Sequence, residues 1–154
     1  MYPAQVTLTH SSINGGSAVT VNCQQVTTAG KKNYQADPNA NITGIVEVQT
    51  VSIENPSFVM QGVVLAQAST STSGSTLTFP QVIQLYKQPN TPGNEITMTI
   101  RYGKDLASAT AIPNSALTST SIKVVLTDYS MPIDVSDSRG GYRPIASLTF
   151  KETA

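Results

Sequence analysis

The stretch Glu95-Ile96-Thr97-Met98-Thr99-Ile100-Arg101-Tyr102 alternates between polar and apolar side chains along its whole length. Successive side chains of a β-strand point to opposite faces of a sheet, so one face of this segment is apolar and the other is polar. A strand with two such faces is typical of an antiparallel sheet that has one side in water. The stretch therefore predicts an antiparallel, mainly β fold. The inward-facing residues are expected to be Ile96, Met98, Ile100 and Tyr102.

The same period of two recurs along the chain, in short runs separated by polar segments. Further inward positions are predicted at Val6 and Leu8; at Val19, Val21 and Cys23; at Val46 and Val48; at Ile122, Val124 and Leu126; and at Ala146, Leu148 and Phe150.

The alternation changes phase between Ile45 and Ile53. Val46 and Val48 share one face of the predicted strand. Val51 and Ile53 fall on the opposite face. A β-bulge or a handover between two sheets would produce this change.

A second interruption follows at Asn55-Pro56, where the proline is expected to break the strand. The segment from Phe58 to Leu65 resumes the pattern and contains Gly62, which suggests a bend. We therefore expect two long strands joined by a short turn.

The segment from Thr78 to Lys87 has a helical rather than a strand period. Thr78 supplies a capping hydroxyl, and Pro80 is well tolerated in the first turn of a helix but not inside a sheet. Alternation over Gln81 to Lys87 would also fit a strand, and a short helix is favoured. The apolar residues on one helical face are Phe79, Val82, Ile83 and Tyr86.

Residues from which enzymes build sites are scarce. The 154 residues include one His, one Cys and no Trp, and 12% are charged. Few acids, bases, nucleophiles or metal ligands can therefore converge. We expect one β-rich structural domain spanning residues 1–154 and not an enzyme, with no catalytic, cofactor-binding or metal-binding residues and no cofactor.

The individual polar candidates have simpler interpretations. Cys23 is expected to pack as a small apolar side chain, and His10 to end a strand at the rim of the core. Asp128 and the segment Asp134-Val135-Ser136-Asp137-Ser138 lie close in sequence, but the glycine and the distal acid of a calcium loop are misplaced, so turn capping is favoured over metal binding. Arg139-Gly140-Gly141-Tyr142-Arg143 is interpreted as a flexible turn and not as an RNA-binding tract.

Charge is balanced, with nine basic and nine acidic residues and a formal net charge of zero. Without a positive stripe, DNA or RNA is not expected to be a tight ligand. Near-zero charge weakens self-repulsion, which suits a subunit that associates with copies of itself. The start of the chain lacks the basic and apolar parts of a secretory signal, and no stretch is long enough to span a membrane, so we expect a soluble protein without membrane insertion.

Three segments follow one another towards the end of the chain: Val51-Ser52-Ile53-Glu54-Asn55-Pro56-Ser57-Phe58 with Gln61-Gly62-Val63-Val64, then the helix-like segment, then Gly141-Tyr142-Arg143-Pro144-Ile145-Ala146-Ser147-Leu148-Thr149-Phe150-Lys151-Glu152-Thr153. This succession resembles the tail tube proteins of tailed viruses. The resemblance implies an antiparallel β-sandwich or barrel with one short helix and long loops.

The same resemblance implies hexameric rings stacked into a hollow tube through which the viral genome passes. The partners would be copies of the protein itself, other tail proteins and, transiently and non-specifically, DNA. The location would be the tail of a virion assembled in the host cytoplasm. The long connection from Gly103 to Ser121 and the N-terminal Met1 to Gln5 are candidate arms towards the adjacent ring.

Two other classes of protein remain open. One is another virion component, such as a decoration, tail-terminator or baseplate protein. The other is a carbohydrate- or receptor-binding β-sandwich, which would need an exposed aromatic platform or a cation site. The residues available for such a platform are Tyr34, Tyr102, Tyr129 and Tyr142.

Overall fold

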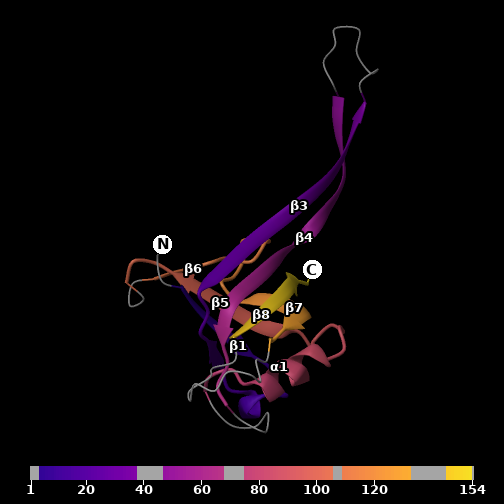
Figure 1. The fold of residues 1–154 in the computed structure, drawn as a ribbon. Helices are drawn as coiled ribbons and strands as arrows, with labels where there is room; N and C mark the ends of the chain where they lie inside the picture. The colour runs from indigo at the N-terminus through magenta and orange to yellow at the C-terminus, as the bar shows by residue number, and fades with distance from the viewer. Residues whose placement is uncertain (1–3, 38–46, 68–74, 106–108, 133–144, 154) are drawn as a thin grey trace.

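The computed structural model describes residues 4–37, 47–67, 75–105, 109–132 and 145–153, which form a mainly β fold (Figure 1). In chain order the elements are β1 (Ala4–Thr9), the short 3-10 helix η1 (Asn14–Gly16), β2 (Val19–Val21), β3 (Gln25–Asp37), β4 (Glu47–Val64), α1 (Phe79–Tyr86), β5 (Ile96–Tyr102), β6 (Thr110–Ala111), β7 (Ile122–Ser130) and β8 (Ile145–Glu152).

The strands form one antiparallel sheet in the order β2-β1-β5-β7-β8-β4-β3, with β6 beside β5. β2 and β3 are at opposite ends of this order, yet only residues 22–24 separate them in the chain. The sheet therefore curls until its two ends meet at this point. There the Val64 N–H donates to the Asn22 carbonyl at 2.8 Å and the Gln24 N–H to the Gln61 carbonyl at 3.0 Å. Among the described strands the ladder does not close into a complete barrel.

Apolar side chains of the curled sheet make one continuous core. Each fully buried large apolar side chain contributes about 1.5–3 kcal/mol relative to an exposed one. The prediction of an antiparallel, mainly β protein with one short helix is confirmed. The predicted inward positions that are buried are Val6, Leu8, Val19, Val21, Ile96, Met98, Ile100, Ile122, Val124, Leu126, Ala146, Leu148 and Phe150.

Two predicted inward positions differ from this pattern. Tyr102, the last residue of β5, is exposed, because the interior of the curl is open at this end of the strand. Cys23 follows β2 and is half-buried against the core, as expected for a small apolar side chain. Burial raises the pKa of the Cys23 thiol.

The predicted break at Asn55-Pro56 is wrong, since β4 continues through both residues. Ala29 pairs with Ser57 and Lys31 with Glu54, so Asn55 and Pro56 together lie opposite the single residue between them on β3. A proline is tolerated at such a bulge because its missing N–H removes no regular ladder bond. Pairing of β4 with β8 also ends at Ser57, so Pro56 has no β8 neighbour that needs a donor.

The two other irregularities of β4 are confirmed. The register of β3 and β4 shifts where Asn33 pairs with Ser52 and Tyr34 with Thr50, which leaves Val51 as an extra residue. This is the bulge that the phase change predicts. The register of β4 and β8 shifts between Met60 and Val63. Gly62 lies there with a φ of +67°, a left-handed conformation that favours glycine.

The predicted helix is confirmed as α1. Thr78 is its N-cap: the Thr78 hydroxyl accepts from the Gln81 N–H, and the Gln81 side-chain carbonyl accepts from the Thr78 N–H. The buried face is rotated from the predicted one. Val82 is buried as expected, but its buried neighbours are Gln81 and Leu85, whereas Tyr86 is exposed. Gln81 can be buried because the cap uses its side-chain carbonyl.

The described part of the connection from Gly103 to Ser121 contacts the sheet of its own chain. This part includes β6, which pairs with the end of β5. The Ile112 N–H donates to the Ile100 carbonyl at 2.8 Å, and the Ile112 side chain packs against the core. At the N-terminus, Ala4 already belongs to β1. Several predictions fall on residues outside the described ranges, namely those for Met1 to Pro3, Val46, Asp134, Asp137 and the segment from Arg139 to Arg143.

Candidate functional site

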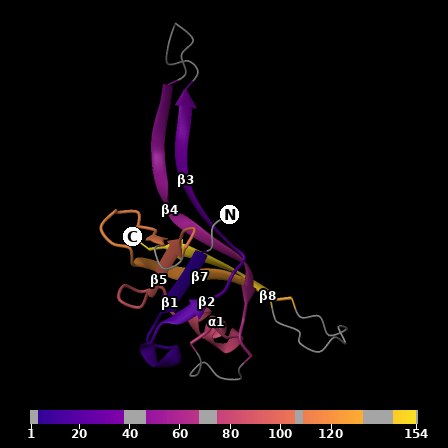
Figure 2. The same cartoon turned by 90° about the vertical axis from the view of Figure 1, so that its left-hand side faces the viewer.

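The ends of β3 and β4 leave the body of the sheet as a two-stranded projection (Figures 1 and 2). Pairing with β8 stops at Ser57, whereas β3 and β4 stay paired from Lys31 and Glu54 to Asp37 and Glu47. We call residues 31–37 and 47–54 the ribbon. Seven residues at about 3.3 Å each give the ribbon a length of roughly 23 Å. A two-stranded hairpin in water is only marginally stable by itself, and this ribbon is continuous with the larger sheet at its base.

The two faces of the ribbon have different chemistry. Asn33 and Ser52 are directly opposite each other, and the Asn33 amide donates to the Ser52 hydroxyl at 2.9 Å and to the Glu54 carboxylate at 3.3 Å. These bonds satisfy the polar face within the ribbon. Ile53 is opposite Lys32, and Tyr34 lies two residues from Lys32 on the same strand, so both belong to the other face.

That second face carries two large apolar side chains with no described cover. Ile53 is 71% exposed and Tyr34 is 64% exposed. We call Tyr34 and Ile53 the apolar face of the ribbon. Neighbouring apolar side chains that are exposed on one face can contribute to a contact with another protein. From the sequence, Ile53 was expected on one strand face and Tyr34 in a possible sugar platform, and no pattern placed the two residues together.

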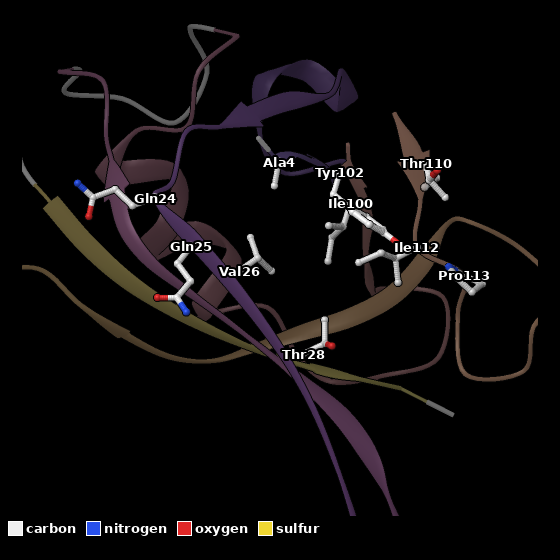
Figure 3. A pocket seen from close by; sticks show the side chains of 11 residues that line it. Ala4, Gln24, Gln25, Val26, Thr28, Ile100, Tyr102, Thr110, Ile112 and Pro113 are labelled. Atoms are coloured by element: carbon white, nitrogen blue, oxygen red, sulfur yellow. The ribbon is translucent and has the colours of Figure 1, made fainter. Parts of the chain in front are cut away.

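A hollow of about 610 Å³ lies beside the base of the ribbon, where the curled sheet stays open (Figure 3). β3 contributes Val26 and Thr28 to one wall, and the end of β5 contributes Ile100 and Tyr102 to the facing wall. The segment after β6 adds Ile112. None of the lining residues is charged. The hollow is therefore a mainly apolar recess with amide and hydroxyl groups at its rim.

The buried carboxylate of Glu152 holds the turn at Ser115, which follows the hollow residue Ile112 in the chain. Glu152 is only 6% exposed, and its Oε1 accepts a hydrogen bond from the Ser115 N–H at 3.0 Å. Its Oε2 has no hydrogen-bond partner among the described residues. Glu152 is on β8 and Ser115 closely follows the hollow residue Ile112, so the contact ties this turn to the end of the sheet. No sequence signal pointed to Glu152, because its role depends on a contact between distant segments.

The tyrosines proposed for a sugar platform lie in separate places. Tyr34 is on the ribbon and Tyr102 is at the hollow. Tyr129 packs edge-on against α1, with ring centroids 6.0 Å from Phe79 and 5.1 Å from Tyr86. Tyr142 is outside the described residues. The described tyrosines therefore do not form one flat stacking surface.

His10 is at the rim of the core, as predicted, and both of its ring nitrogens have hydrogen-bond partners. Nδ1 accepts from the Ser12 N–H at 3.1 Å and lies 2.7 Å from the Ser12 hydroxyl, while Nε2 donates to the Asn94 carbonyl at 3.1 Å. The tautomer is assigned from these partners. The serine contact was not expected from the sequence. It is a local bond across two residues. The bond from Nε2 to the Asn94 carbonyl ties the end of β1 to the segment before β5.

The described residues offer few other groups that could bind a ligand or a metal ion. Asp128 is exposed on β7. Within the described ranges, no three His, Cys, Asp or Glu residues come close enough to hold a metal ion. Over the same residues, no helix has the length and apolar character needed to cross a membrane.

No protein-family model matches the sequence, and no curated protein matches it. Among solved structures, the chain is similar to one in the cryo-EM structure of the anti-feeding prophage (AFP) baseplate, 6-fold symmetrised. The two chains share 11% sequence identity with a TM-score of 0.55, over 100% of this chain and 91% of the other. At this identity the likeness concerns the fold. The two chains share a fold, and the resemblance to tail tube proteins stays a prediction.

Proposed function

We propose that the protein is a structural subunit of a phage-like tail and that it assembles with copies of itself into rings. The observation that carries this proposal is the ribbon, whose apolar face is exposed in a single copy. The similar fold in a baseplate structure determined with 6-fold symmetry supports it. The proposed role is structural and assigns no catalytic residue and no cofactor.

Strand edges offer a second means of assembly. β2 and β3 end the order of the described sheet. The outer side of β2 is bonded to the segment 75–77, where the Thr20 N–H donates to the Ser75 carbonyl and the Leu77 N–H donates to the Thr20 carbonyl, whereas β3 pairs with β4 alone among the described strands. Natural proteins often protect such edges with charged side chains. The charged residues of β3, Lys31, Lys32 and Asp37, lie on the ribbon, whereas residues 25–30 at its base carry no charge. This uncharged edge can pair with a strand of another copy.

Within this proposal, stacked hexameric rings forming a tail tube are the more specific role. A neutral chain suits a wall past which DNA moves without binding, because strong phosphate contacts need a surplus of Lys and Arg. The location would be the virion tail, with assembly in the host cytoplasm.

The second candidate is a baseplate component that assembles with other tail proteins. The similarity to a chain of the AFP baseplate favours it specifically. The two candidates differ in what the purified protein does alone. A tube subunit polymerises by itself, whereas a baseplate component stays as a monomer or a single ring until its partner is added.

The experiment is negative-stain electron microscopy with light scattering over a concentration series of the untagged protein. Rings or hollow tubes are the expected result. The test variant is Tyr34→Ser with Ile53→Ser, which removes the apolar face of the ribbon and is expected to abolish assembly. The matched control is Asn33→Ala with Ser52→Ala, which alters the polar face of the same ribbon and should still assemble.

Circular dichroism separates loss of assembly from loss of folding in both double variants. A native protein that stays monomeric at every concentration would contradict self-assembly. A screen of immobilised glycans would then test the carbohydrate-binding alternative.

A further inference from the structure

The hollow and the apolar face of the ribbon are two apolar surfaces that the described residues of a single copy leave uncovered. The hollow has walls from β3, β5 and the segment after β6, with Val26, Ile100 and Ile112 as its apolar lining. The ribbon presents Tyr34 and Ile53. We infer that the hollow of one copy receives the apolar face of the ribbon of a second copy, an inference that rests on the proposed self-assembly.

The ribbon cannot enter the hollow of its own chain. β3 is continuous from Gln25 to Asp37, so Thr28 in the wall of the hollow and Tyr34 on the ribbon belong to one extended strand. Six residues at about 3.3 Å each separate them by roughly 20 Å. Figures 1 and 2 show the ribbon directed away from the body of the sheet in both views. The occupant of the hollow must therefore come from another molecule.

The size and chemistry of the two surfaces match. The hollow measures about 610 Å³, within the range of about 300–1,000 Å³ that encloses a drug-sized molecule. This is enough for one tyrosine and one isoleucine side chain. None of the residues that line the hollow is charged. Lys32 lies opposite Ile53 on the inserting face, and its long side chain would keep the ammonium in water at the rim of the hollow. The Tyr102 and Thr28 hydroxyls at the recess offer partners for the tyrosine hydroxyl, which needs one when buried.

The uncharged edge of β3 adds backbone recognition. Residues 25–28 are paired with β4 on one side and border the hollow on the other. The strands of an incoming ribbon have their own outer edges beyond Ser57, where β8 no longer pairs. Edge-to-edge pairing would orient the ribbon while the apolar side chains fill the recess. Such a contact joins different surfaces of the two copies, and contacts of this type close into rings or extend into helical stacks.

Site-directed cross-linking tests this arrangement. Two variants are made in a Cys23→Ala background, Ile53→Cys on the ribbon and Ile112→Cys in the hollow, and they are mixed and treated with a short bis-maleimide. The expected result is a cross-linked dimer of one copy of each variant. The matched control replaces Ile112→Cys by Asn90→Cys, which is exposed near the other end of β5, and no cross-link with Ile53→Cys is expected.

The outcomes separate this inference from the proposed function. Rings or tubes that form without the 53–112 cross-link, or with an equal 53–90 cross-link, would overturn the placement of the ribbon and leave self-assembly standing. A second variant, Ile112→Glu, places a charge in the hollow and is expected to abolish assembly while the circular dichroism spectrum stays native. Unchanged assembly of folded Ile112→Glu would also overturn the inference. A native protein that never assembles would overturn the proposed function itself.

Discussion

Replacement of Met98 by aspartate is expected to unfold the protein, whereas the same replacement at the adjacent Thr97 is expected to leave it folded. Met98 is in the centre of β5 and is 0% exposed. Thr97 points to the opposite face, where its hydroxyl accepts a hydrogen bond from Lys123 Nζ at 2.8 Å. The pair of variants therefore places one carboxylate on each face of the same strand.

The magnitudes follow from these surroundings. Truncation of a buried methionine costs about 2–5 kcal/mol, and an unpaired buried carboxylate adds several kcal/mol. The sum is comparable to the whole stability of a typical domain, about 5–15 kcal/mol. At Thr97 the new carboxylate would face the ammonium of Lys123, and an exposed ion pair contributes about 0–1 kcal/mol. A net change within about 1 kcal/mol is expected there.

The assay is urea denaturation followed by circular dichroism, at a protein concentration below the onset of assembly. Met98→Leu serves as the volume-conserving control and is expected to cost less than about 1.5 kcal/mol. A Met98→Asp variant with a native spectrum and an unfolding free energy close to that of Met98→Leu would refute the assignment of this face to the core. Unfolding of Thr97→Asp would refute the assignment of the other face to solvent.

Three further substitutions test local features. Gly62→Ala forces alanine into a φ of +67° and brings its Cβ within 2.6 Å of the Gln24 side chain. A loss of about 1–2 kcal/mol is expected, and urea denaturation should show that Gln24→Ala relieves only part of it. Glu152→Ala removes the acceptor of the Ser115 N–H. It should cost about 1–3 kcal/mol and speed hydrogen exchange at that amide, whereas Glu152→Gln should cost less. Thr78→Ala removes the cap of α1 and should cost about 0.5–2 kcal/mol, measured by thermal unfolding; no change would contradict the capping role.

Local patterns predicted the elements whose causes are local. β5 alternates along its length, and α1 has a hydroxyl cap and a proline in its first turn, so both could be recognised without any neighbour. The bulges at Val51 and Gly62 were also visible, the first because the alternation changes phase there and the second because a glycine inside a strand pattern indicates a bend. Asn55-Pro56 was misinterpreted because the tolerance of a proline depends on the partner strand. Only the register with β3 places a bulge there.

The candidate surfaces were much less predictable. Tyr34 was visible as an exposed aromatic candidate, but its pairing with Ile53 on one face depends on the register of two strands with two bulges. The hollow combines Val26 with Ile100 and Ile112, residues far apart in the chain. No periodic pattern in the sequence indicates that these residues lie together, because they come together only when the sheet curls.

The sequence by itself determined the strand alternation, the capped helix, the neutral charge and the scarcity of catalytic residue types, since these are properties of residue order and composition. Only the tertiary structure decided where pairing between β4 and β8 ends, so that β3 and β4 continue alone as the ribbon. It also decided where the curled sheet stays open and leaves the hollow. The physical reason is that strand alternation specifies which side chains face inward, whereas the choice of neighbouring strands and their register depends on contacts between distant segments.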